Sequence, residues 1–302
     1  MKIGPFVQAD ILPQKLNQKK FLLTLEVDPP KGPGVKKILS QIKPLIQYID
    51  AINVACCPVA KLRMDPLAFA ILLKQEFDIE VIIHLTMRDM SLLGLQSYLI
   101  GSSALGIHNI LAMTGDTARH SDIPKTKGVF QANSLTLLKM MGQMNNRLNF
   151  DGKKLNKKSK FFAGATCNPS AINLTNEIKK MNKKIEAGAE FFQTQPLFLD
   201  KNLDVFLKYT NTEIHKPILM GTMLLKSYDS SLWLNESVPS LFVPSEVLTS
   251  LKKDDTQENG LKIASEFCKK AMNKVNGLHL FPLNNYEALL ELVQEVKSFQ
   301  KK

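Results

Sequence analysis

The sequence predicts a (β/α)8 barrel on the basis of three observations. Apolar runs of strand length recur at intervals of about 30 residues, the usual size of a strand–helix unit. Segments with helical periodicity separate these runs, and polar residues stand where the runs end. Parallel strands that pair with their sequence neighbours through right-handed crossovers close most simply as a barrel. An open, doubly wound sheet is the alternative, although neither GxGxxG nor GxxxxGKS follows a predicted strand.

Eight segments qualify as strands because they are rich in β-branched and aromatic residues and are bounded by turn residues. The first delivers two carboxylates, Glu26 and Asp28, to its end, where Pro29-Pro30 stops it. In chain order the predicted strands are Phe21–Val27, Asp50–Ala55, Glu80–Thr86, Asn109–Thr114, Phe161–Thr166, Glu190–Gln195, Pro217–Thr222 and Leu278–Pro282.

The segments between the strands carry apolar residues at helical spacing. The predicted helices are Gly34–Tyr48, Asp65–Phe77, Ser91–Leu105, Ser134–Asn146, Ala171–Ala187, Lys201–Tyr209, Ser227–Leu251, Gly260–Val275 and Tyr286–Phe299. Pro239 and Pro244 are expected to interrupt one of them. Two long connections, Thr117–Gln131 and Lys226–Ser245, follow strands and belong on the rim that carries the chemistry of a barrel. Arg147–Ser159 instead enters a strand and belongs on the opposite rim.

Length and composition favour one cytoplasmic domain. The chain has 302 residues, 44% of them hydrophobic, so we expect a single barrel domain over residues 1–302, with an N-terminal extension (1–19) and a C-terminal helix (286–299). No signal-peptide pattern begins the chain, and no apolar stretch approaches the roughly 20 residues that cross a bilayer. The four cysteines lack CxxC spacing, which suits reduced thiols. The adjacent Cys56-Cys57 is either a redox pair or two small residues packed at a strand end.

The net charge of +11 raises the question of nucleic-acid binding. The excess lies in lysine-rich stretches, Lys153–Lys160 and Lys179–Lys184, which lack the interleaved aromatic residues and arginines that stack on bases or grip phosphates. We therefore expect no nucleic-acid partner. A positive rim suits a polyanionic cofactor or substrate instead.

Glu26 is the first candidate for catalysis. It shares a strand face with Thr24 and Asp28, so if that face points into the barrel the carboxyl is desolvated and its pKa rises. A carboxyl with a raised pKa can serve as a general acid at neutral pH. A structural ion pair with a lysine or arginine is the alternative interpretation.

Other strand ends carry polar residues suited to binding. His84 stands near the end of the third strand, and the fourth ends with Gly115 and Asp116, where a simple turn is the alternative. Gln193 and Gln195 share one face of the sixth strand, and two primary amides suit a planar heterocycle. Neither HExxH nor a cluster of acids at metal-ligand spacing is present, so no metal is expected and an organic cofactor would carry the chemistry.

An ordered series of motifs resembles the methylenetetrahydrofolate reductase family of flavoprotein barrels. The motifs cover nearly the whole chain in family order, which makes the series specific although each piece is weak. They are EVDPPKG (Glu26–Gly32), DAIN (Asp50–Asn53), RMDPLA (Arg63–Ala68), HLTMRD (His84–Asp89), LLGLQS (Leu92–Ser97), ALGIHNILAMTGD (Ala104–Asp116), GVFQANS (Gly128–Ser134), NPSA (Asn168–Ala171), KIEAGAEFFQTQPLF (Lys184–Phe198) and VPSLFVP (Val238–Pro244).

The resemblance implies the short, single-domain form of the enzyme, which reduces 5,10-methylenetetrahydrofolate, or a related pterin carrier, to the 5-methyl product with FAD. It places this activity in one-carbon metabolism, tetrahydrofolate interconversion and methionine biosynthesis. By match, Glu26 and Asp116 are the catalytic residues. The matched substrate-binding positions are Gln195, Ser230 and Asn285. The matched FAD-binding positions are Ala55, Cys56, His84, Thr114, Gly115, Asp116, Ala132, Asn168, Glu177, Lys180 and Lys184.

The electron donor is left open between NAD(P)H and an electron-transfer protein. Leu234 stands where the family carries an aromatic residue that sandwiches the substrate or the nicotinamide. A homo-oligomer or a complex with a redox partner is expected. The alternative functions are a flavin-binding barrel subunit that obtains electrons from a partner protein and a basic RNA-associated barrel.

Overall fold

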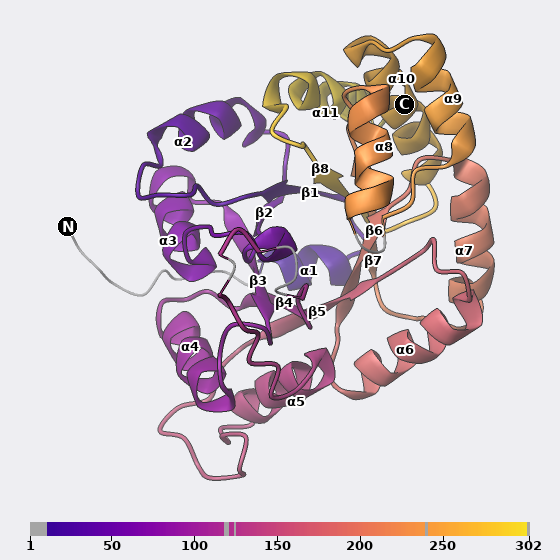
Figure 1. Cartoon of the computed structure of the whole chain (residues 1–302). Coiled ribbons are helices and arrows are strands. Elements are labelled where there is room, and N and C mark those ends of the chain that lie inside the picture. Colours follow the sequence, from indigo (N-terminus) through magenta and orange to yellow (C-terminus); the bar gives the residue numbers. More distant parts are fainter. Residues whose placement is uncertain (1–10, 118–120, 124, 239–240, 301–302) are drawn as a thin grey trace.

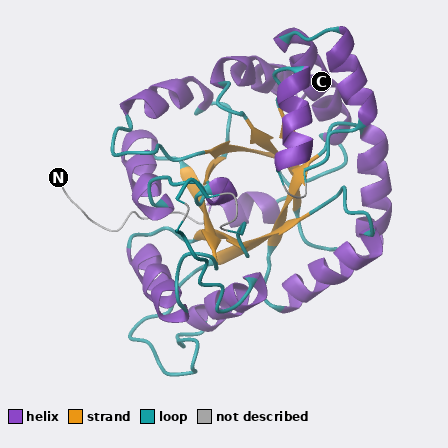
Figure 2. Ribbon diagram, in the orientation of Figure 1, coloured by secondary structure: helices purple, strands orange, loops and turns teal. Residues whose placement is uncertain are grey.

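The computed structural model describes residues 11–117, 121–123, 125–238 and 241–300. Eight parallel strands form a closed barrel in the order β1 to β8, ringed by helices (Figures 1 and 2). The strands are β1 Leu22–Val27, β2 Ala51–Val54, β3 Glu80–Thr86, β4 Asn109–Met113, β5 Phe162–Cys167, β6 Phe191–Pro196, β7 Ile218–Met223 and β8 Gly277–Phe281. The predicted (β/α)8 class is confirmed, and each predicted strand is present with bounds that differ by at most one residue.

The outer helices also follow the prediction, with boundaries set by capping residues. Asp65, Ser91, Asn173 and Thr256, for example, each accept a hydrogen bond from a backbone N–H in the first turn of the helix that follows. The helices are α1 Ile11–Asn17, α2 Lys36–Ile42, α3 Pro66–Phe77, α4 Leu92–Ala104, α5 Ser134–Asn145, α6 Leu174–Glu186, α7 Asp200–Glu213, α8 Tyr228–Ser237, α9 Ser245–Lys253, α10 Gln257–Ala271 and α11 Tyr286–Gln300, with short 3-10 turns η1 Lys43–Leu45 and η2 Pro58–Ala60. None of these helices is long and apolar enough to cross a bilayer.

Three helices differ from the prediction in instructive ways. The segment predicted as Gly34–Tyr48 ends its α-helix at Ile42, because Pro44 turns the chain into η1. The segment Ser227–Leu251 forms α8 and α9 separately, which confirms the interruption at Pro244; Pro239 lies outside the described residues. Helix α1, within the expected N-terminal extension, was not predicted.

Helix α1 closes the N-terminal end of the barrel (Figure 1). Leu12 and Leu16 are buried against a layer of inward-facing strand residues: Leu22, Ala51, Ile82, Leu111, Phe162, Phe191 and Leu219. Lys15 pairs with Asp50 at 2.6 Å, and the other oxygen of Asp50 accepts a hydrogen bond from the N–H of Leu23. The apolar plug therefore leaves the opposite end of the barrel for polar side chains.

The parallel register brings polar side chains together above this layer. Side chains alternate along a strand, so residues two positions after the apolar layer also face inward. Thr24 lies beside His279, and Glu26 lies beside Asn53. The buried polar residues two positions after this layer, or four in the case of Thr86, are Thr24, Asn53, His84, Thr86, Gln193 and His279.

The connections on the C-terminal rim pack against one another. The backbone N–H of Val129 donates to the carbonyl of Arg88, which follows β3, and the N–H of Leu62 donates to Asp122. The described part of Thr117–Gln131 therefore lies on the predicted rim. Helices α8 and α9, after β7, contribute to a separate apolar cluster that includes Met223, Leu234 and Val243.

Candidate active site

The polar interior of the barrel centres on Glu26, whose carboxyl lies between two histidines. Its Oε2 is 3.4 Å from Nε2 of His279 and 4.0 Å from Nε2 of His84. The Glu26 side chain is 20% exposed, whereas the side chains of His279 and His84 are 2% and 6% exposed. Glu26 is therefore the member of the cluster that solvent or a ligand can reach.

Asn53 and Thr24 hold the two histidines. The side-chain Oδ1 of Asn53 is 3.3 Å from Nε2 of His84, and its Nδ2 is 3.3 Å from Nδ1 of His279. The hydroxyl of Thr24 is 3.0 Å from the same Nδ1. Neighbouring strands β1, β2, β3 and β8 supply all five groups, so the barrel closure itself assembles the cluster.

Burial sets the charge state of this cluster. It raises the pKa of the Glu26 carboxyl above the ordinary range, and His84 opposes only part of the rise. Burial also lowers the pKa of His84 to about 4 and that of His279 to about 3. At neutral pH both imidazoles are neutral, and burial shifts the Glu26 carboxyl toward its protonated form, the form that a general acid requires. The predicted rise in the Glu26 pKa is thus confirmed.

Asp28 is a second carboxyl at the same strand end. Burial and the neighbouring Glu26 raise its pKa to about 6, although Arg63 opposes the shift. The Nη2 of Arg63 lies 3.8 Å from Oδ2 of Asp28, so this contact is loose. The alternative interpretation, an ion pair with lysine or arginine, fits Asp28 better than Glu26.

Asp116 and Gly115 contact the segments that follow or end the neighbouring strands β2 and β3. Oδ2 of Asp116 accepts a hydrogen bond of 2.9 Å from the backbone N–H of Val59, a β-branched residue at φ 53°. Gly115 has φ +93°, and a Cβ there would lie 2.9 Å from Cβ of Thr86. Only glycine satisfies both conditions. Thr114, one residue earlier, is exposed.

The residues after β2 have separate partners. Ala55 is buried, and Sγ of Cys56 lies 3.8 Å from the hydroxyl of Thr86. Cys57, at φ 43°, instead donates its thiol to the carbonyl of Arg63. Burial raises the pKa of Cys56 to about 11, so its thiol stays protonated and unreactive. The packing interpretation of the cysteine pair fits this geometry.

Gln193 and Gln195 face the interior from β6, across the barrel from β2. Gln193 is 2% exposed, and neither atom of its amide has a hydrogen-bond partner among the described residues. Gln195, at the strand end, is partly exposed. A buried amide without partners is costly, and a ligand with donors and acceptors would satisfy it.

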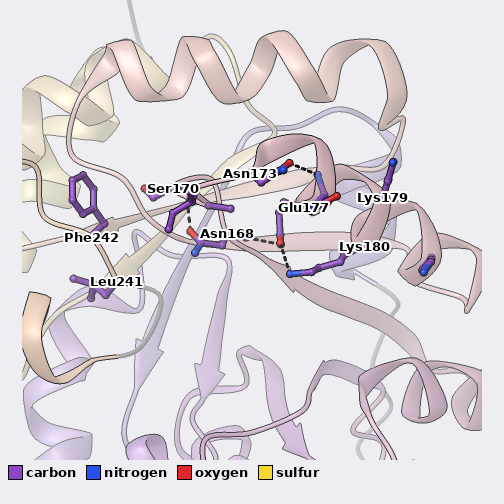
Figure 3. A pocket seen from close by; sticks show the side chains of 12 residues that line it. Asn168, Ser170, Asn173, Glu177, Lys179, Lys180, Leu241 and Phe242 are labelled. Carbon is purple, nitrogen blue, oxygen red and sulfur yellow. Dashed lines mark hydrogen bonds and ion pairs between the residues drawn. The ribbon is translucent and has the colours of Figure 1, made fainter.

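An open cleft of about 670 Å³ lies between α6 and the segment that leads into α9 (Figure 3). Glu177 anchors it: one carboxylate oxygen accepts from the N–H of Asn168, and the other lies 3.4 Å from Nζ of Lys180. Phe242 lies on the far wall and is 50% exposed. The cleft is lined by Asn168, Ser170, Ala171, Ile172, Asn173, Asn176, Glu177, Lys179, Lys180, Lys183, Leu241 and Phe242. A lysine-lined cleft with an apolar wall suits an anionic ligand with a flat ring.

The remaining predicted positions are dispersed. Lys184 does not line the cleft; its amine donates to the carbonyl of Thr166 at the end of β5. Ala132 is partly buried just before α5. The hydroxyl of Ser230 donates a hydrogen bond to the carbonyl of Ser227 at the start of α8. Asn285, just before α11, donates a hydrogen bond to Gln257, the first residue of α10. The structure thus brings Glu26 and His84 together and leaves Ser230 and Asn285 engaged in helix ends.

The sequence interpretation did not select Asn53 or His279. Both are lone polar residues inside apolar strands. The strand register reveals them, because it places His279 beside Thr24 across the β1–β8 seam and Asn53 beside Glu26 on β2. The only local signal for His279 was the alternation of side-chain direction along the strand GLHLF, which predicts that the histidine faces the barrel interior. Within the described ranges, no group of three or more histidines, cysteines and acids is arranged to hold a metal.

A model of the family described as methylenetetrahydrofolate reductase matches residues 11–297, which is nearly the whole chain. The chain belongs to the methylenetetrahydrofolate reductase family. Relatives include methylenetetrahydrofolate reductase 1 of Schizosaccharomyces pombe, 23% identical over 74% of this chain and 37% of its own length. Methylenetetrahydrofolate reductase (NADH) 1 of Arabidopsis thaliana is 26% identical over 91% of this chain and 48% of its own length. The chain therefore spans less than half the length of these relatives.

Solved structures agree on the barrel. An uncharacterized protein from Clostridium thermocellum, described as binding two copies of 5-methyl-5,6,7,8-tetrahydrofolic acid, has a TM-score of 0.67 at 14% identity. The similarity covers 96% of this chain and all of that one. Tryptophan synthase from M. tuberculosis has a TM-score of 0.53 at 10% identity over 95% of each chain. At these identities the likeness establishes the fold alone.

Proposed function

We propose that this protein is an FAD-dependent reductase that converts 5,10-methylenetetrahydrofolate, or a related pterin carrier, to its 5-methyl form. The observation that carries the proposal is Glu26, a partly exposed carboxyl whose pKa is raised by burial inside a barrel of this family. The relatives named as methylenetetrahydrofolate reductases support the substrate class.

Glu26 supplies the proton in the proposed reaction. Transfer of that proton to N10 of the carrier lets the bond between N10 and the methylene carbon break, which leaves an iminium at N5 and a Glu26 carboxylate. FAD, when reduced and bound, would supply the hydride that the methylene carbon accepts. One proton and one hydride thus convert the methylene bridge into a methyl group.

The residues present fit both ligands. The cleft beside α6 presents Lys179, Lys180 and Lys183, which suit the diphosphate of FAD, and the ring of Phe242 lies on the opposite wall. The amide of Gln193, buried without partners, suits the donors and acceptors of a pterin. Asp116, which follows β4, would add a negative charge near the strand ends, where we propose that both ligands bind.

The burial of Leu234 affects which electron donor can reduce the flavin. Leu234 is 6% exposed within the apolar cluster of α8 and α9, and it offers no ring for nicotinamide to stack on. We therefore propose slow oxidation of NADH by the isolated protein and faster reduction by a redox partner protein.

Anaerobic mixing tests the proposal. The protein is reconstituted with FAD, reduced chemically and mixed with 5,10-methylenetetrahydrofolate, while flavin absorbance and the 5-methyl product are followed. We expect one product molecule for each flavin reoxidised, and no reoxidation with tetrahydrofolate, which lacks the one-carbon unit. Flavin that stays reduced with both compounds would contradict the proposed function.

A further inference from the structure

The orientation of the Asn53 amide determines which nitrogen of His279 carries the proton. The Asn53 amide contacts both histidines, with Oδ1 toward Nε2 of His84 and Nδ2 toward Nδ1 of His279. An amide nitrogen only donates and an amide oxygen only accepts. This orientation makes Nδ1 of His279 an acceptor, so the neutral ring carries its proton on Nε2, the nitrogen 3.4 Å from Glu26.

The same network fixes the imidazole in place. His279 is 2% exposed, and its ring packs edge-on against Phe281 with centroids 4.5 Å apart. The hydroxyl of Thr24 lies on the same side as the Asn53 amide, 3.0 Å from Nδ1. The ring is therefore held by Thr24, Asn53 and Phe281, and its Nε2–H is aimed at Oε2 of Glu26.

We propose that His279 is a positioning residue for Glu26: its Nε2–H, oriented by Asn53, holds Oε2 so that the proton to be transferred sits on the other carboxyl oxygen. After proton transfer the same N–H stabilises the new carboxylate. The destination of the proton rests on the proposed function, but the contact between His279 and Glu26 does not.

A matched pair of substitutions separates this role from simple packing. In His279→Gln the side-chain amide nitrogen can reach the position of Nε2, whereas in His279→Asn it reaches only the position of Nδ1. Both variants lose the ring and remain uncharged. A positioning role predicts that His279→Gln keeps most of the rate of flavin reoxidation by methylenetetrahydrofolate, while His279→Asn loses at least about tenfold, part of the factor attributed to a positioned acid. Flavin reduction stays unchanged in both.

The pH profile gives a readout that a packing role would not move. Removing a donor to the Glu26 carboxylate disfavours its ionised form, so the decline in rate with rising pH shifts to higher pH in His279→Asn and stays in place in His279→Gln. The other groups that face Glu26 are Asp28 with its partner Arg63, His84 from β3 and Tyr286 from α11. All of them are common to both variants.

Infrared titration of the Glu26 carboxyl tests the contact without any turnover. The band is assigned by difference against Glu26→Gln, and nitrogen NMR of wild-type protein reports which imidazole nitrogen of His279 carries the proton. We expect Nδ1 without a proton and a Glu26 titration that moves upward in His279→Asn alone. Protonation at Nδ1, or equal shifts in the two variants, would overturn the proposal. If wild-type protein fails to oxidise reduced flavin with the folate, the proposed function fails, while the infrared and NMR results still decide the role of His279.

Discussion

At the scale of single residues, burial governs the chemistry of the site. The same loss of water that raises the pKa of Glu26 lowers the pKa values of His84 and His279, so burial favours the uncharged form of all three groups. The acid form of Glu26 is present below its raised pKa and is lost as the pH rises through it. Proton transfer from Glu26 should therefore fail on the alkaline side.

Asp116 is expected to tune the flavin. Asp116→Asn removes a negative charge near the strand ends but can still accept the Val59 N–H, so the loop should hold while the flavin reduction potential rises. The potential is measured by anaerobic titration against a reference dye. Asp122→Asn is the control, because Asp122 also accepts a loop N–H, from Leu62, but lies exposed. If the flavin reduction potential shifts equally in both variants, or in neither, Asp116 does not lie close to the flavin.

Gly115 tests the packing of the strand ends. Alanine there meets both a φ of +93° and a Cβ contact of 2.9 Å to Thr86, so Gly115→Ala should lower the free energy of unfolding by about 1–3 kcal/mol. Urea unfolding measures this change. Gly101→Ala, in α4 with open space around the new methyl group, should instead raise stability by about 0.5–1 kcal/mol. If Gly115→Ala leaves the free energy of unfolding unchanged, the strand ends can shift to accommodate the new methyl group.

At the scale of elements, α6 contributes both a wall and the charge of the cleft. Lys179, Lys180 and Lys183 line it, while Glu177 turns inward and fastens the start of the helix to Asn168 (Figure 3). Lys184, one residue further, is drawn to the carbonyl of Thr166. Neighbouring lysines on one helix thus have different tasks, which periodicity alone could not separate.

Charge reversal on this helix tests the cofactor site. Lys180→Glu should weaken FAD binding at least about tenfold, since the site loses one cation and gains an anion beside the expected diphosphate. Fluorescence titration of FAD measures the affinity. Lys208→Glu, at an exposed position of α7 that does not line the cleft, carries the same charge change and should bind FAD normally. Unchanged affinity in Lys180→Glu would place the diphosphate elsewhere.

At the scale of the whole molecule, the barrel was readable from the sequence because each strand is a short apolar run with polar residues at its end. The structure keeps all eight strands, and the unpredicted α1 is a seven-residue helix whose two buried leucines acquire meaning only against the barrel floor. Glu26 was foreseeable, since a carboxylate inside an apolar strand is costly without a role. Asn53 and His279 were not, because their partners lie 31 and 253 residues away along the chain.

The most direct test of the central claim compares the two half-reactions in Glu26→Gln. An amide cannot release the required proton, so flavin retention and flavin reduction should be normal, while reoxidation by 5,10-methylenetetrahydrofolate falls by at least about 10²-fold. Glu190→Gln is the control, because burial also raises the pKa of Glu190 but that residue lies at the opposite end of the barrel, before β6. Equal losses in both half-reactions of Glu26→Gln, or full reoxidation activity, would contradict the role of Glu26 as the acid.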